Sequence, residues 1–124
     1  MQLLLKTMDY PPDMVEVAKE DFEKFRKRHL FEEPTENILI PIEINNQKYV
    51  IYTGENMQGG FGSEHFIIKG SKDKLVYGIV IIVKVSETDE ILDITETDVK
   101  EITDCFTDGI PYGNGQVAFF KVTY

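Results

Sequence analysis

The segment that most constrains the fold is NILIPIEINNQKYVIYTG, residues 37–54. An Ile at every second position from 38 to 44 predicts a strand with one apolar face, because side chains alternate between the faces of a strand. Asn45 and Asn46 follow, and Asn tolerates the positive φ angles of a two-residue hairpin turn. The sequence therefore predicts a β-hairpin with a fixed register. The expected cross-strand pairs are Ile40–Ile51, Ile42–Tyr49 and Glu43–Lys48.

Pro41 fixes the place of this hairpin in the sheet. Counted outward from the turn, its nitrogen points away from the partner strand, so the missing N–H does not weaken the hairpin. The same missing N–H prevents regular pairing on the other side. The strand at 38–44 is therefore predicted to be a sheet edge.

The rest of the chain alternates between helical and strand periodicity. Residues 12–29 are interpreted as an amphipathic helix, with Pro11 and Pro12 in its first turn and Asp13 and Glu16 at its positive end. A second helix, capped by Thr95 or Thr97, is expected to reach residue 108. Strands are expected at 2–7, 38–44, 47–53, 65–69, 75–85, around 91–94 and at 116–124.

These elements predict one α+β domain over residues 1–124, a mainly antiparallel sheet of about five or six strands with two helices, in the order β-α-β-β-β-β-α-β. The four middle strands are expected to form a meander. Residues 79–83 are apolar at every position, which indicates a central strand covered on both faces. Four side chains are expected to be more than nine-tenths buried: Phe22, Ile42, Ile81 and Phe120.

Charge is distributed unevenly along the chain. The acidic segment, defined here as residues 86–108, holds nine acidic residues and a single basic one, Lys100. Outside it, 13 acids nearly balance 12 Lys and Arg residues, so almost all of the net charge of −9 lies in this segment. Exposed helices usually mix both signs at i and i+4, because like charges there repel. The segment is either a face kept for a cationic partner or a charged surface that keeps the protein soluble.

We expect the first of these functions, the binding of a basic protein. The predicted contact residues are Asp93, Glu96, Asp98, Glu101, Asp104, Asp108 and Tyr112. Carboxylates can replace the phosphates in a basic nucleic-acid-binding groove, and opposite charge speeds association. The same charge disfavours direct binding of nucleic acid or an anionic membrane.

In size, acidity and lack of a catalytic motif, the chain is similar to bacterial immunity proteins that neutralise secreted toxins. This resemblance of class implies an inhibitor or antitoxin that acts on a basic partner, for example a nuclease. Such a protein needs no catalytic residue, cofactor or metal. The sequence gives no indication of an oligomeric state.

Two other functional classes stay open. A small ligand-binding or regulatory module is expected to contain an apolar cavity between the helices and the sheet. A small enzyme needs titratable groups that converge in one pocket, for which Glu64, His65 and Tyr112 are the candidates. Cys105 is expected to be inert rather than paired with His29 or His65, because the surrounding acids disfavour its thiolate.

Other motifs are absent or incomplete. The glycines of GGFGSEH, residues 59–65, lead into a predicted strand rather than a helix, which favours a hairpin loop with Phe61 exposed over a phosphate cradle. The acidic segment lacks the Gly of an EF-hand, and two His residues without a Cys cluster give no zinc signature. A single Cys and the absence of a signal peptide or a long apolar run predict a cytoplasmic protein.

Overall fold

The computed structural model describes residues 1–7, 12–55, 65–68, 75–77 and 79–108, and the side chains of residues 1–7, 12–55 and 79–102. These residues form an α+β fold in which an antiparallel sheet has the order β2–β1–β7–β4–β3, with β8 paired to β7. A second antiparallel sheet has the order β6–β5–β9. The strands are β1 (Gln2–Lys6), β2 (Asp13–Glu16), β3 (Ile38–Ile44), β4 (Gln47–Thr53), β5 (His65–Ile68), β6 (Leu75–Tyr77), β7 (Val80–Val85), β8 (Ile91–Leu92) and β9 (Phe106–Asp108), and the helices are α1 (Phe22–Leu30) and α2 (Glu96–Cys105), with 3-10 turns at Lys19–Asp21 and Pro34–Glu36.

The β3–β4 hairpin has the predicted register, with the pairs Ile40–Ile51, Ile42–Tyr49 and Glu43–Lys48. Asn45 and Asn46 have φ angles of 50° and 66°, as a type I′ turn requires. Among the described strands, β3 lies at the border of its sheet, so the edge predicted from Pro41 is confirmed.

One prediction for the hairpin was wrong. Ile42 is only partly buried, not nine-tenths buried. The reason is its place on the edge strand, where the side chain has neighbouring strands on one side only.

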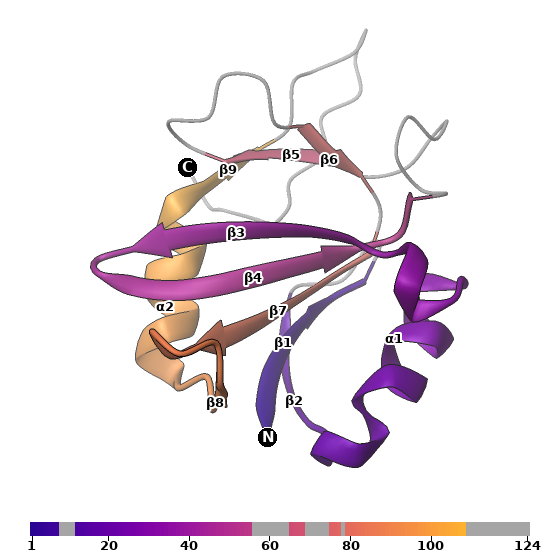
Figure 1. Ribbon diagram of the computed structural model, residues 1–124. Coiled ribbons are helices and arrows are strands. Elements are labelled where there is room, and N and C mark those ends of the chain that lie inside the picture. Colours follow the sequence, from indigo (N-terminus) through magenta and orange to yellow (C-terminus); the bar gives the residue numbers. More distant parts are fainter. Residues whose placement is uncertain (8–11, 56–64, 69–74, 78, 109–124) are drawn as a thin grey trace, which may run out of the picture.

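The central strand is β7, which lies between β1 and β4, and the prediction of a strand covered on both faces is confirmed. Val80 and Ile82 pack with α2 residues in one apolar cluster, and Ile81 and Val83 pack with α1 residues in the other. Helices α1 and α2 therefore lie on opposite faces of the main sheet (Figure 1). Ile81 at 0% exposure and Phe22 at 7% confirm the expected core, whereas Phe120 lies outside the described residues.

The first helix is shorter than predicted. Residues 13–16, expected in its first turns, instead form β2, which pairs antiparallel with β1. Three consecutive Leu residues of β1, at positions 3, 4 and 5, are buried, which shows that both faces of this strand are covered. The edge of β1 that does not pair with β7 pairs with β2. Val15 lies opposite Leu3 in that pairing, and a β-branched residue suits a strand better than a helix. The helix begins only at Phe22, after Lys19–Asp21.

The predicted strand at 75–85 is two strands in two different sheets. β6 pairs with β5, whereas β7 pairs with β1 and β4. The expected meander is also wrong, because both edges of β4 are already occupied by β3 and β7. β5 has no edge of β4 to join, and it forms the second sheet with β6 and β9 instead.

The end of the described chain confirms a short strand, β8, and a helix that begins after Thr95. The helix ends at Cys105, three residues before the predicted end, and Phe106–Asp108 form β9, paired with β5. The loop at 59–64 with Phe61, and the strand expected at 116–124, lie outside the described residues. In the described part of the chain no helix is long and apolar enough to cross a membrane.

Candidate functional site

The acidic segment begins with a tight turn after β7. The backbone N–H of Ser86 donates to the carbonyl of Glu90 at 2.8 Å, and the N–H of Asp89 donates to the carbonyl of Ser86 at 3.0 Å. The Ser86 hydroxyl oxygen accepts from the N–H groups of Thr88 and Glu90 at 3.2 and 3.0 Å. The turn therefore holds its shape through its own hydrogen bonds and leaves its acidic side chains in solvent.

Five carboxylates of the segment are exposed: Glu87, Asp89, Glu90, Asp93 and Glu96. They come from the turn, from the residue after β8 and from the first residue of α2. None of them is paired with a Lys or Arg among the described side chains. Asp93 accepts a hydrogen bond from the backbone N–H of Gln2 at 2.8 Å, which ties the segment to β1. Lys48, on the hairpin, lines the same shallow hollow as Glu87, and this hollow has a volume of about 230 Å³.

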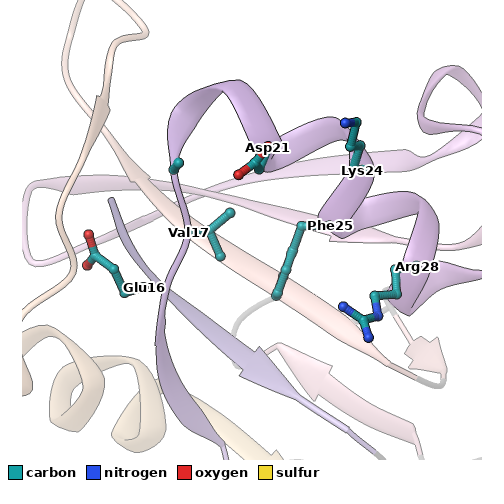
Figure 2. Close-up of a pocket in the computed structure, with 7 residues that line it drawn as sticks. Glu16, Val17, Asp21, Lys24, Phe25 and Arg28 are labelled. Atoms are coloured by element: carbon teal, nitrogen blue, oxygen red, sulfur yellow. The ribbon is translucent and has the colours of Figure 1, made fainter.

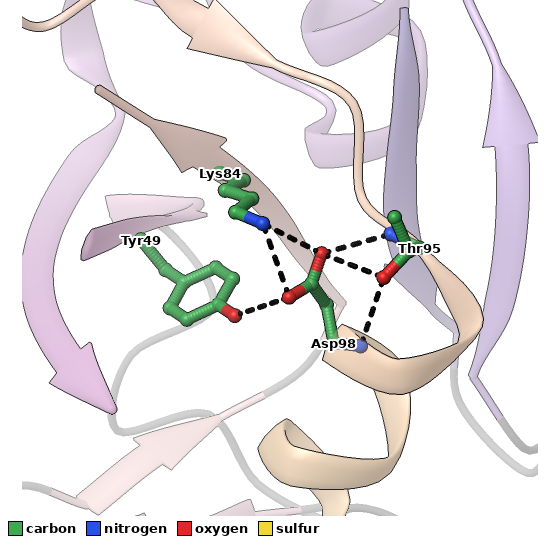
Figure 3. A network of polar contacts seen from close by, with 4 residues as sticks. All are labelled: Tyr49, Lys84, Thr95 and Asp98. Atoms are coloured by element: carbon green, nitrogen blue, oxygen red, sulfur yellow. Dashed lines mark hydrogen bonds and ion pairs between the residues drawn. The ribbon is translucent and has the colours of Figure 1, made fainter. Parts of the chain in front are cut away.

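Asp98 was predicted to lie on the outer acidic face, and this prediction was wrong. Its side chain is 6% exposed and accepts hydrogen bonds from three residues (Figure 3). The Tyr49 hydroxyl donates at 3.0 Å, and the Lys84 ammonium lies 3.2 and 3.0 Å from the two carboxylate oxygens. The Thr95 N–H and hydroxyl donate at 2.9 and 3.0 Å. The carboxylate is thus an internal acceptor that joins α2 to β4 and β7.

The contacts between Thr95 and Asp98 form a capping box. The Thr95 hydroxyl oxygen accepts from the N–H of Asp98 at 3.2 Å, and the Asp98 carboxylate accepts in return from the N–H of Thr95. Such reciprocal bonds satisfy N–H groups that a helix leaves unpaired at its first turn. Thr95 is therefore the N-cap of α2. The sequence had predicted either Thr95 or Thr97 in this role.

The buried network changes the acidity of two groups. Burial acts to raise the pKa of Asp98, but hydrogen bonds from Thr95, Lys84 and Tyr49 favour the ionised carboxylate and lower this pKa overall. The pKa of Tyr49 is raised, first by burial and then by its hydrogen bond to the Asp98 carboxylate. At neutral pH Asp98 is therefore a carboxylate and Tyr49 a neutral phenol.

Of the remaining predicted contact residues, only Glu101 has a side chain within the described part of the chain. Glu101 is partly buried on α2. The backbone of Asp104 lies in α2 and that of Asp108 in β9, so Asp108 is on a strand and not on the predicted helix. The side chains of Asp104 and Asp108, and the whole of Tyr112, lie outside the described residues. The structure thus places Asp93 and Glu96 at the surface and removes Asp98 from it.

The surface cleft in Figure 2 bears on the ligand-binding alternative. It has a volume of about 340 Å³ and lies between the end of β2 and the first turns of α1. Val17 and Phe25 are drawn between Glu16 on the strand and Arg28 on the helix (Figure 2). Its lining residues are Glu16, Val17, Ala18, Asp21, Lys24, Phe25 and Arg28, of which four are charged. This lining differs from the apolar cavity that a small-ligand module was expected to have.

The catalytic alternatives gain no support from the described residues. His29 lies on α1 and Cys105 on α2, and these helices cover opposite faces of the sheet. Burial, and secondarily the nearby Arg28 charge, lowers the pKa of His29. The side chains of Glu64, His65 and Tyr112 lie outside the described part of the chain.

The sequence interpretation missed two groups of residues. The first is the Tyr49–Lys84 pair that binds Asp98. The Thr-x-x-Asp spacing of residues 95–98 could have identified Asp98 as a capping residue, but no local pattern connects it with Tyr49 or Lys84. The second group is Glu32, Glu36 and Glu55, whose carboxylate oxygens lie within 4.8 Å of one another. No local pattern connects Glu55 with the other two, and only the fold brings them together.

Comparisons with protein-family models, with curated proteins and with solved structures gave no match to this chain.

Proposed function

We propose that this protein binds and inhibits a basic protein partner, as an immunity protein or antitoxin inhibits a nuclease toxin. One observation carries the proposal: five exposed carboxylates follow one another from the turn after β7 to the start of α2, with no Lys or Arg paired to them in the described structure. Carboxylates arranged in this way attract a cationic surface and raise the rate of productive encounter.

The buried network supports the same proposal. Asp98 fixes the first turn of α2 to β4 and β7, and the hydrogen bonds of Ser86 fix the turn before β8. The backbone on both sides of β8, which carries the exposed carboxylates, is therefore ordered by these contacts. A surface that is already ordered loses less conformational entropy when it binds.

The partner we propose is a protein with a basic groove, such as a nuclease toxin. The function requires no catalytic residue, cofactor or metal on this chain, and no direct contact with nucleic acid or membrane. The cytoplasm is the compartment we propose for it, because the chain contains a single Cys and no other residue with which that Cys can form an intrachain disulfide.

The test is a comparison of two charge-reversal variants of equal net charge. Glu87→Lys with Glu90→Lys changes the turn between β7 and β8. Glu20→Lys with Glu23→Lys changes two exposed acids in the 3-10 turn Lys19–Asp21 and in the first turn of α1. The partner is captured on the immobilised wild-type protein and identified, and its association rate is then measured against salt concentration by stopped flow.

We expect the first variant to associate about 10-fold more slowly, or slower still, at low salt, and the second to stay close to wild type. The wild-type rate is expected to fall as salt rises, because charges more than about 8 Å apart are largely screened at physiological ionic strength. Equal losses in both variants, or a partner without a basic surface, would show that the acidic segment is only a solubility surface.

A further inference from the structure

A second group of carboxylates lies far from the acidic segment. Glu32 follows the C-cap residue of α1, Glu36 ends the 3-10 turn Pro34–Glu36, and Glu55 comes two residues after β4. One carboxylate oxygen from each lies within 4.8 Å of the other two. The acidic segment begins directly after Val85, which pairs with Lys48 near the start of β4. Glu55 follows the other end of β4, where Thr53 pairs with Val80. The turn at residues 86–90 and the three Glu residues are therefore at opposite ends of β4.

Glu32 is the unusual member of this group. Its side chain is 7% exposed, and neither carboxylate oxygen has a hydrogen-bond partner. A buried ionised carboxylate without a donor or a cation is strongly unfavourable, and almost all buried charges in proteins are paired or bind metals. Glu36 and Glu55 are exposed and add two more negative charges within reach of the same point.

Two basic side chains of α1 contact other groups, although Nε of Arg26, like the carboxylate oxygens of Glu32, is buried without a hydrogen-bond partner. The Arg26 guanidinium lies 4.8 Å from the ring centre of Phe22 and 4.7 Å from that of Tyr52, and it donates to the side-chain oxygen of Asn37 at 3.4 Å. Lys27 pairs with Glu33 at 2.9 Å. The end of α1 adds a partial negative charge of its own, because helix C-termini present carbonyl groups. Among the described side chains, none of these three acids forms an ion pair with a Lys or Arg residue.

Gly54 keeps the space beside Glu32 open. A Cβ atom at Gly54 would lie 2.6 Å from Oε1 of Glu32 and 3.1 Å from the carbonyl oxygen of Leu30. Any larger residue at this position would push the carboxylate away. The absence of a side chain therefore lets the end of β4 pass directly beside a carboxylate and a carbonyl oxygen.

We propose that Glu32, Glu36 and Glu55 bind a divalent cation, and that this cation is Ca²⁺. All three donors are carboxylate oxygens, which hard cations prefer, and the group contains no His or Cys of the kind that selects zinc. Ca²⁺ accepts several carboxylates in a flexible geometry, whereas Mg²⁺ demands near-octahedral geometry, keeps several waters and is usually held by only one or two carboxylates. The ion neutralises Glu32 and links the segment after α1 to the end of β4. This inference is independent of the proposed partner.

The first experiment measures binding on the full chain after treatment with a chelator. Tb³⁺ serves as a luminescent substitute for Ca²⁺ that is excited through tyrosine, and the chain has six Tyr and no Trp. We expect Tb³⁺ emission that Ca²⁺ removes, and a Ca²⁺ dissociation constant between about 10⁻⁵ and 10⁻³ M by calorimetry. The matched variants are Glu36→Gln, expected to bind at least about 10-fold more weakly, and Glu33→Gln, the neighbouring acid outside the group, expected to bind within about twofold of wild type.

The second experiment tests whether the cation stabilises the fold through Glu32. With Ca²⁺, wild type and Glu33→Gln are expected to melt at a higher temperature than in chelator, and Glu32→Gln is expected not to respond. In chelator, Glu32→Gln is expected to melt at or above the wild-type temperature, because it removes a buried charge. No binding of Ca²⁺ at concentrations of about 10 mM, or equal weakening by Glu33→Gln and Glu36→Gln, would overturn the proposal.

Discussion

Replacing Asp98 with Ala removes the one acceptor shared by Tyr49, Lys84 and Thr95. The substitution leaves the Lys84 ammonium, whose side chain is 17% exposed, without its anion and the Tyr49 hydroxyl without its acceptor. It also deletes half of the capping box of α2. All three losses act on the contact between α2 and the sheet, so we expect a large loss of stability.

The size of that loss follows from the burial of the pair. Removing one partner of a buried ion pair costs about 3–5 kcal/mol, because the other charge stays buried and uncompensated. Loss of a helix cap alone costs about 1 kcal/mol, and the two effects overlap because they share one carboxylate. With a urea m-value of about 2 kcal/mol/M, the midpoint of unfolding is expected to fall by about 2 M. Glu96→Ala, an exposed acid in the same turn, is the control and is expected to shift the midpoint far less.

The pH dependence gives a second measurement on the same variant. The pKa of Asp98 is lower in the folded protein than in the unfolded chain, because hydrogen bonds outweigh burial. Its stabilisation is therefore complete above the unfolded pKa of about 3.9 and is lost as the pH falls through the folded pKa. The difference in unfolding free energy between wild type and Asp98→Ala is expected to be constant from pH 7 to about pH 5 and to shrink below about pH 4. A midpoint close to that of Glu96→Ala at pH 7, or a difference that grows in acid, would refute the reasoning.

Three further predictions concern packing and backbone geometry. Ile81→Ala should lower the unfolding free energy by about 2–5 kcal/mol, because Ile81 is 0% exposed. Ile42→Ala should lower it by clearly less, because Ile42 is only partly buried on an edge strand. Equal losses in urea titrations would contradict this prediction. Asn46→Gly should raise stability by about 0.5 kcal/mol, because Gly is favoured at this position of a type I′ turn, where Asn46 has a φ of 66°; a lower melting temperature would count against it. Phe31→Gly should stabilise by about 0.5–1 kcal/mol, because Phe31 ends α1 at a φ of 57° with its side chain 72% exposed; a loss of stability would show a packing role for its ring.

The parts of the fold that the sequence predicts correctly depend on short-range chemistry. The register of β3–β4 is set by a two-residue turn and by alternating Ile residues, all within one local segment. Thr95 caps α2 through residues three positions away. The central place of β7 is visible because buried apolar residues on both faces leave a continuous run in the sequence.

The parts that it missed depend on contacts between distant residues. Residues 13–16 have helical spacing, but the unpaired edge of β1 makes them a strand, and no local pattern reports that edge. Residues 106–108 likewise leave the predicted helix because β5 is there to pair with them. Asp98 has the spacing of an outward helix residue, yet Lys84, 14 positions away, and Tyr49, 49 positions away, draw it inward.

The geometry of the acidic segment also indicates which of its acids need a functional explanation. Glu96 and Asp98 lie in the first turn of α2, where the positive end of a helix stabilises carboxylates without any partner. Glu87, Asp89 and Glu90 lie outside the helix, in the turn between β7 and β8. Hydrogen bonds to the Ser86 hydroxyl order the backbone of this turn. Solubility requires net charge but not its concentration in one ordered turn. These three residues are therefore where the docking hypothesis and the solubility interpretation make different predictions, and the charge reversal at Glu87 and Glu90 distinguishes the two.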